Sequence, residues 1–167
     1  MHVVIIGAGQ AASQVVMGLR QNDNNCKITL IGDEADLPYQ RPPLSKKFLS
    51  GEMEKERLYF KPPNFYTEAE IDVKLNCHVT RIDRDNKKIF YGPAESIAYD
   101  KLVLATGSRP RKLPIPNIDL DGIYDLRSIA DIEAIRAEAT PGKKLIIVGG
   151  GYIGLETAAS CKALLIK

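Results

Sequence analysis

A short apolar run opens the chain and a glycine-rich segment follows at once, and this order restricts the fold more than any other feature. Residues 3–6 are all β-branched, which is typical of a strand buried on both faces of a parallel sheet. Gly7, Gly9 and Ala12 follow with the spacing G-x-G-x-x-(G/A). In this pattern the first glycine permits a tight turn, the second lets the backbone approach a pyrophosphate, and the small third residue lets a helix pack closely on the sheet. Because the N-terminus of a helix favours anions, the segment predicts a Rossmann-like nucleotide site.

This pattern requires an acidic residue about 20 positions further on, and the chain has one. Residues 26–31 indicate a second buried strand, and Asp33 follows it, 21 positions after Ala12. A carboxylate at this strand end can accept hydrogen bonds from both hydroxyls of an adenosine ribose. The alternative is an ordinary turn with a solvated Asp33. The order of strand, glycines, helix, strand and acid favours the nucleotide site.

The end of the chain repeats its beginning. Residues 144–148 are an apolar run that predicts a strand, and Gly149, Gly151 and Gly154 restore the G-x-G-x-x-G spacing before a helix expected to continue to Lys167. Two such sites predict two dinucleotides, and an enzyme that binds two usually passes a hydride from a nicotinamide to a flavin. A second tight turn without a ligand is the alternative.

A proline-rich segment at residues 37–46 separates the second strand from the middle of the chain. Its three prolines exclude a long helix or a central strand. A segment this rigid can hold Arg41 and Lys46 at fixed positions, suited to a phosphate or an anionic ring. The pattern equally allows a loop with two solvated cations.

The middle of the chain predicts a small antiparallel meander, because turn residues separate three short strand-like pieces. A short helix is expected at residues 64–70, with Asn64 as a possible N-cap. A longer helix is expected at residues 129–139, capped by Ser128 or Asp131. The strands expected in this part of the chain are 71–75, 79–83, 88–91, 96–99 and 101–105.

The cysteines and histidines argue against a redox-active disulfide and against a metal site. Cys26, Cys77 and Cys161 are far apart and form no close pair, as in reduced cytosolic proteins. His2 and His78 are the only histidines and are too scattered for metal ligation.

Charge and hydropathy exclude other classes of partner. A net charge of +2 is too small to favour nucleic acid or an acidic membrane surface. The longest nearly apolar run, residues 145–155, is shorter than the roughly 20 residues of a membrane-spanning helix. No secretory leader is expected, so the predicted location is the cytoplasm.

Taken together, these motifs closely resemble those of the FAD-dependent pyridine nucleotide oxidoreductases. Within them they are most similar to the single-component ferredoxin, rubredoxin and putidaredoxin reductases, relatives of apoptosis-inducing factor. The Arg-Pro-Pro-Leu-Ser-Lys segment at 41–46 is the most specific to this subgroup. The segments that carry the likeness are 4–12, 30–34, 37–46, 104–111 and 148–156.

The resemblance implies how FAD would be held. Asp33 would bind the adenosine ribose, and Val79 would contact the adenine through its backbone. Arg41 and Lys46 would contact the flavin side, with Lys46 near the isoalloxazine ring. The residues implied at the pyrophosphate are Gly7, Gly9, Ala11 and Ala12. Those implied to close over the cofactor are Ala105, Thr106, Gly107 and Arg111.

The resemblance also implies an NAD(P)H site at the second glycine pattern, with Glu156 near the nicotinamide. Lys46 and Glu156 are therefore the candidate catalytic residues. Hydride transfer needs no protein nucleophile, because the flavin carries the chemistry. A cationic Lys46 would stabilise the reduced, anionic flavin. The residues implied to bind NADH are Gly149, Gly151, Tyr152, Ile153 and Gly154.

The function implied is a flavoprotein oxidoreductase that passes a hydride from NAD(P)H to FAD and electrons to a small iron–sulfur protein, a ferredoxin or a rubredoxin. The disulfide reductases of the same superfamily carry a close cysteine pair on the first long helix. Residues 13–18 contain none, so the chain resembles the non-disulfide branch. The competing hypothesis is a truncated, non-enzymatic module that binds FAD or another nucleotide without turnover.

The expected fold is α/β. Residues 1–112 are expected to form a Rossmann-like FAD-binding domain of three layers (ββα) with an antiparallel meander. Residues 113–142 would be a linker and helix, and residues 143–167 the first βα unit of a second dinucleotide-binding domain. Since relatives are longer, the resemblance implies that the segments completing both domains are not among these residues. The acid that chooses between NADH and NADPH is expected about 20 residues after Gly154, beyond Lys167.

Overall fold

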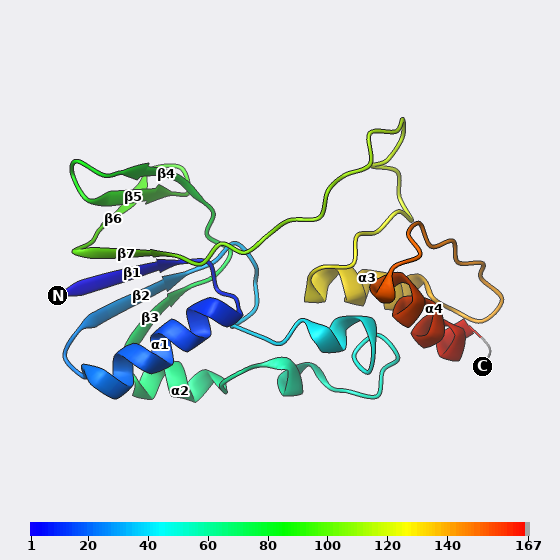
Figure 1. Cartoon of the computed structure of the whole chain (residues 1–167), viewed down its shortest axis with the longest axis horizontal. Helices are drawn as coiled ribbons and strands as arrows, with labels where there is room; N and C mark the ends of the chain where they lie inside the picture. Colours follow the sequence, from blue (N-terminus) through cyan, green and yellow to red (C-terminus); the bar gives the residue numbers. More distant parts are fainter. Residues whose placement is uncertain (166–167) are drawn as a thin grey trace. The chain divides into compact units, whose positions relative to one another are not determined.

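The computed structural model describes residues 1–165, which divide into two compact units (Figure 1). The first unit contains Met1–Tyr39 and Tyr59–Gly107. The second unit contains Gln40–Leu58 and the chain from Ser108 onward. The domain boundaries expected after residues 112 and 142 stay predictions, because a compact unit and a domain of the complete fold need not coincide.

A four-stranded parallel sheet forms the centre of the first unit, in the order β3-β2-β1-β7. Strand β1 is an inner strand, and because both faces of the sheet are covered, its Val and Ile side chains are buried on both faces, as the uninterrupted apolar run predicts. Helix α1 follows β1 directly, and α2 precedes β3. The elements are β1 (His2–Ile6), α1 (Gln10–Asn22), β2 (Lys27–Ile31), α2 (Pro63–Glu68), β3 (Ile71–Lys74) and β7 (Lys101–Leu104).

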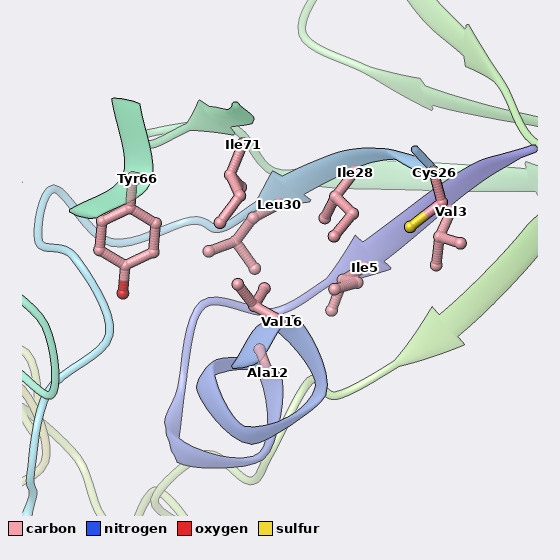
Figure 2. Close-up of a cluster of buried hydrophobic side chains, with 9 residues drawn as sticks. All are labelled: Val3, Ile5, Ala12, Val16, Cys26, Ile28, Leu30, Tyr66 and Ile71. Atoms are coloured by element: carbon pink, nitrogen blue, oxygen red, sulfur yellow. The ribbon is translucent and has the colours of Figure 1, made fainter. Parts of the chain in front are cut away.

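One face of this sheet is covered by α1 and α2, and the buried side chains between them form the larger core cluster (Figure 2). Val3 and Ile5 of β1 point to this side. Full burial of one such side chain contributes about 1.5–3 kcal/mol. The labelled residues are Val3, Ile5, Ala12, Val16, Cys26, Ile28, Leu30, Tyr66 and Ile71.

The other face is covered by a three-stranded antiparallel sheet of order β4-β5-β6. Its Ile89 is fully buried against Val4, Ile6 and Ile31 of the parallel sheet. The strands are β4 (Val79–Asp83), β5 (Lys88–Tyr91) and β6 (Glu95–Ala98). The predicted meander and the predicted three-layer α/β architecture are both confirmed.

Arg20, in the last turn of α1, ties three segments of the first unit together. Its guanidinium donates hydrogen bonds to the carbonyl oxygens of Ala69 (2.6 Å), Cys26 (2.7 Å) and Glu70 (3.2 Å). These carbonyls belong to the approach to β2 and to the turn between α2 and β3. The parallel strands are thereby anchored at the end opposite to the glycine turn.

Helix α2 differs from the prediction at its start. It begins at Pro63 with Pro62 as N-cap, so Asn64 is not the cap. The Asn64 side chain instead donates to Glu68 Oε1 at 3.0 Å. The physical reason is that proline suits the first helical position, where a backbone N–H has no intrahelical partner.

Among the described residues, the second unit contains two helices and two 3₁₀ turns joined by irregular chain. Ser128 caps α3: its hydroxyl accepts from the Asp131 N–H, and the Asp131 carboxylate accepts from the Ser128 N–H. Both residues named from the sequence therefore share the cap, with Ser128 as N-cap. The elements are η1 (Pro42–Ser45), η2 (Lys55–Leu58), α3 (Ile129–Glu138) and α4 (Tyr152–Leu165).

The strand predicted at residues 144–148 is not formed. Ile146 and Val148 are 86% and 77% exposed, and within residues 1–165 no strand pairs with this stretch. A strand is stable only beside a neighbour that satisfies its backbone hydrogen bonds. Helix α4 nevertheless begins at Tyr152, as the glycine pattern predicts.

Candidate functional site

The carboxyl ends of the parallel strands meet at one edge of the sheet, where the first glycine turn lies. The Gly7 N–H donates to the carbonyl of Ile31 at 2.8 Å, and the Ala105 N–H donates to that of Ile6 at 2.7 Å. The turns after β1, β2 and β7 are therefore adjacent. In open α/β sheets, ligands bind outside the carboxyl ends of the strands where the strand order reverses.

Gly7 occupies a position that no other residue type fits. Its φ is +102°, and a Cβ built there would lie 2.2 Å from the Ala105 carbonyl oxygen. The chain after β1 and the chain after β7 thus approach each other too closely for a side chain at Gly7. This contact explains the first glycine of the pattern as a requirement of folding.

Gly9 has a different role, because a Cβ there would meet no atom within 4 Å. It is the N-cap of α1, it has no side chain to cap the helix, and the first turn of α1 contains no acidic residue. The uncapped end of the helix therefore faces open space and carries a partial positive charge. Ala11 is exposed beside it, whereas Ala12 is fully buried against the sheet.

Asp33 follows β2 at the same edge and is 51% exposed. The loop that carries it is fixed to the chain after β3, where Cys77 N–H donates to Gly32 O at 2.8 Å and Asn76 N–H to Glu34 O at 3.0 Å. This places His78 Nδ1 3.8 Å from Asp33 Oδ2.

An open hollow of about 420 Å³ is lined by His78 and Thr80, the neighbours of Val79 in the chain, although Val79 itself does not line it. The residues that line the hollow are Asn76, Cys77, His78, Thr80, Tyr91, Gly92, Pro93 and Glu95.

The chain after β7 also lies at this edge of the sheet. Thr106 and Gly107 are exposed there, and Gly107 has a φ of +67°.

In the second unit, the two candidate catalytic residues form an ion pair. Lys46 Nζ lies 2.8 Å from Glu156 Oε2, and the Ser45 hydroxyl donates to the same oxygen at 2.6 Å. These hydrogen bonds, first from Lys46 and then from Ser45, lower the pKa of Glu156 below its ordinary value of 4.5. The carboxylate is therefore ionised at neutral pH.

Arg41 lies in the same unit, just before η1. Its Nη1 donates to the carbonyl oxygen of Arg127 at 2.5 Å, which links the proline-rich segment to the N-terminus of α3. Arg111 is exposed. The flavin contacts that the resemblance implies for Arg41 and Arg111 stay predictions.

The second glycine pattern forms a tight turn even without a preceding strand. Gly149 has a φ of +118°, and a Cβ on Gly154 would lie 2.1 Å from the Gly149 carbonyl oxygen. A Cβ on Gly151 would meet nothing within 4 Å. Tyr152 and Ile153, which follow, are 88% and 58% exposed. In this turn, as in the first, one glycine has no room for a side chain and another has open space. Gly154 is the former and Gly151 the latter.

Ser45 and His78 are site residues that sequence reasoning missed. Ser45 stood inside the proline-rich segment, and His78 was considered only as a metal ligand. Ser45 lies within the Arg-Pro-Pro-Leu-Ser-Lys segment, but no role was assigned to it there, and His78 lies outside the segments that carry the likeness. Only the fold brings Ser45 to Glu156 and His78 to Asp33.

Residues 1–165 hold no group of three or more His, Cys, Asp or Glu side chains suited to a metal ion. None of the helices in this range is long and apolar enough to cross a membrane. Cys26, Cys77 and Cys161 are free thiols.

The two sheets, the helical layer and the glycine turn at the carboxyl edge define a Rossmann-type fold of the kind found in FAD-dependent reductases. The chain belongs to the pyridine nucleotide-disulphide oxidoreductase family, which it matches over residues 1–166.

Individual relatives agree with this assignment. The chain is 40% identical to rhodocoxin reductase of Rhodococcus erythropolis over 97% of its own length and 38% of the relative. It is 43% identical to the ferredoxin–NAD(+) reductase component of the p-cumate 2,3-dioxygenase system of Pseudomonas putida, over 97% of its length and 40% of the relative. The chain thus spans about 40% of the length of these relatives.

Solved structures agree as well. The chain superposes on the reductase in a covalent putidaredoxin reductase–putidaredoxin complex with a TM-score of 0.91 and 39% identity. The match covers 98% of this chain and 40% of that one.

Proposed function

We propose that these residues are the part of a flavoprotein oxidoreductase that holds FAD and begins its NAD(P)H site. The whole protein would pass a hydride from NAD(P)H to FAD and electrons to a small iron–sulfur protein of the ferredoxin or rubredoxin type. Bound FAD supplies the chemistry, since it accepts two electrons together and releases them singly. The observation that carries the proposal is the open space at Gly9, at the uncapped N-terminus of α1.

The first unit fits the adenosine diphosphate half of FAD. A pyrophosphate needs room and backbone N–H donors, and the N-terminus of α1 at Gly9 offers both. Asp33 has half of its surface exposed at the same sheet edge, as a ribose acceptor requires. The hollow beside Val79 offers room for the adenine. Ala105, Thr106 and Gly107 border this edge and would close over the cofactor.

The second unit fits a nicotinamide dinucleotide at its glycine turn. Gly151 leaves open space at the start of α4, which suits the pyrophosphate of NAD(P)H. Glu156 lies one turn further along the same helix and would face the nicotinamide. Lys46, paired with Glu156, would lie near the flavin ring, as the resemblance implies.

The iron–sulfur partner is proposed from the relatives. A putidaredoxin reductase has been solved in covalent complex with putidaredoxin, and other relatives are named as rubredoxin or ferredoxin reductases.

The experiment compares FAD binding by the unaltered chain, Gly9→Ala and Gly18→Ala. Gly18 lies in the same helix, and a Cβ there also meets nothing within 4 Å, so it is the matched control. We expect Gly9→Ala to keep its circular dichroism and to bind FAD at least about tenfold more weakly, because the methyl group fills the pyrophosphate space. Gly18→Ala should bind FAD as the unaltered chain does. Equal affinity in all three, or no FAD binding by the unaltered chain, would overturn the proposal.

A further inference from the structure

Ser45, the last residue of η1, donates one hydrogen bond to α4 and accepts another from it. Its hydroxyl donates to Glu156 Oε2 at 2.6 Å. Its carbonyl oxygen accepts from the Ser160 hydroxyl at 2.8 Å. Glu156 and Ser160 are four residues apart and therefore lie on one face of α4. The two contacts hold the Ser45 backbone and its side chain against the same helical turn.

Glu156 Oε2 has two donors of different character. Lys46 is half exposed. Its ammonium also donates to the Pro42 carbonyl at 3.3 Å, but its long side chain has more rotatable bonds than serine and carries a compact point charge. The Ser45 side chain has one rotatable bond to its oxygen, and Ser45 is only 5% exposed. Its donor direction is therefore set by the backbone of η1.

The backbone of η1 is itself rigid. Pro42 and Pro43 fix two φ angles at its start, and Leu44 is 1% exposed. The orientation of the Glu156 carboxylate is thus determined mainly by the serine, while the lysine supplies charge.

We propose that Ser45 is a positioning residue for hydride transfer, whose hydroxyl fixes the Glu156 carboxylate in the orientation that faces the nicotinamide. This inference rests on the proposed function and adds to it a residue that neither the glycine patterns nor the resemblance assigned. Ser45 acts through Glu156 and has no contact with the hydride itself.

The test uses Ser45→Ala, with Ser160→Ala as the matched control. Each variant removes one hydroxyl and one hydrogen bond between η1 and α4, but only Ser45→Ala removes a donor from Glu156. The first measurement is an NMR titration of the Glu156 side-chain carboxyl, assigned with Glu156→Gln. We expect the pKa of Glu156 to rise toward 4.5 in Ser45→Ala and to stay unchanged in Ser160→Ala. Equal titration curves in all three chains would overturn the inference, and so would an equal rise in both variants.

The second measurement is the rate of flavin reduction by saturating NADH in the FAD-loaded chain. We expect this rate to fall about tenfold in Ser45→Ala, because a group that loses its fixed position slows the step it supports, with unchanged FAD affinity. Ser160→Ala should reduce its flavin at the unaltered rate. An unchanged rate in Ser45→Ala would overturn the positioning role. Absence of FAD binding in the unaltered chain would instead overturn the proposed function and the hydride-transfer role with it, while the titration would still decide the Ser45–Glu156 link.

Discussion

Lys46 Nζ lies 2.8 Å from Glu156 Oε2, although 110 positions separate the two residues in the sequence. The resemblance gave them separate roles, one near the flavin ring and one near the nicotinamide. In the structure they form one ion pair whose charges largely offset each other. The proposed action of Lys46 on reduced flavin therefore depends on Glu156 as well.

This pair predicts opposite shifts of the flavin reduction potential in two variants. Lys46→Met leaves a carboxylate without its cation, so the anionic reduced flavin is disfavoured and the potential becomes more negative. Glu156→Gln leaves Lys46 without its counter-charge, so the potential becomes less negative. Both potentials are measured by equilibration with a reference dye under anaerobic conditions. Shifts of the same sign in the two variants would contradict a shared electrostatic role.

The same pair predicts how stability changes with pH. Because folding lowers the pKa of Glu156, its contribution to stability is complete above the ordinary value of 4.5 and is lost as pH falls through the lowered, folded-state value. Urea unfolding of the unaltered chain and Glu156→Gln at several pH values measures this contribution. The variant should be less stable at pH 7, and the difference should vanish at the acid end. A difference independent of pH would show that the pair does not titrate.

The two glycines of the first turn predict different outcomes for the same substitution. Gly7→Ala places a methyl group 2.2 Å from the Ala105 carbonyl oxygen at a φ of +102°, and we expect it to destabilise the first unit by at least about 2–3 kcal/mol. Gly9→Ala should cost only about 0.5–1 kcal/mol, because alanine is a poorer N-cap than glycine, while the φ of −100° and the open space at Gly9 add no strain. Urea unfolding followed by circular dichroism compares them. Equal stability would contradict the close approach after β1 and β7.

Replacement of Arg20, which is partly buried and lies outside the candidate site, should lower the stability of the first unit strongly. Arg20→Met removes four hydrogen bonds to carbonyl oxygens, those of Ala69, Asp23, Cys26 and Glu70, but keeps most of the apolar stem. Since a bond from a charged donor contributes about 1.5–3 kcal/mol, we expect a loss of at least about 2 kcal/mol in unfolding free energy. Arg20→Lys keeps the charge but not the fork of donors and should recover only part of this loss. Full recovery by lysine would indicate that charge alone matters there.

Loss of the N-cap of α3 should destabilise that helix moderately and leave the other helices unaffected. Ser128→Ala removes the hydroxyl that accepts from the Asp131 N–H at 3.2 Å, and a lost N-cap costs about 1 kcal/mol. Hydrogen exchange should accelerate in the first turn of α3 and stay unchanged in α1, whose N-cap is Gly9. Uniform acceleration in both helices would show that the effect is global.

The sequence predicted the first unit well because each of its signals is local. The β-branched run of β1, the spacing of Gly7 and Gly9, and the turn residues of the meander each describe a few neighbouring residues. The position of Asp33 at the end of β2 was predictable because its distance from the turn along the chain is set by one helix and one strand.

The features that the sequence did not predict depend on which segments of the chain meet in space. Residues 144–148 have the composition of a strand, but composition does not reveal whether a neighbouring strand is present to pair with it. The Ser45–Glu156 and His78–Asp33 contacts join residues far apart in the sequence, so no spacing rule could predict them. The start of α2 was mispredicted for a local reason: Asn64 was expected as the N-cap, but the proline beside it is the stronger signal for the first helical position.

The most direct test of the account is the visible absorbance spectrum of the FAD-loaded chain before and after anaerobic addition of NADH, for the unaltered chain and Gly151→Ala. We predict flavin bands that NADH bleaches in the unaltered chain. Gly151→Ala should keep its flavin but need much more NADH for the same bleaching, because its methyl group occupies the space left at the second turn. Flavin bands that NADH leaves unchanged would support the nucleotide-binding module without turnover. The absence of flavin, or equal bleaching in both chains, would contradict the assignment of the two glycine turns.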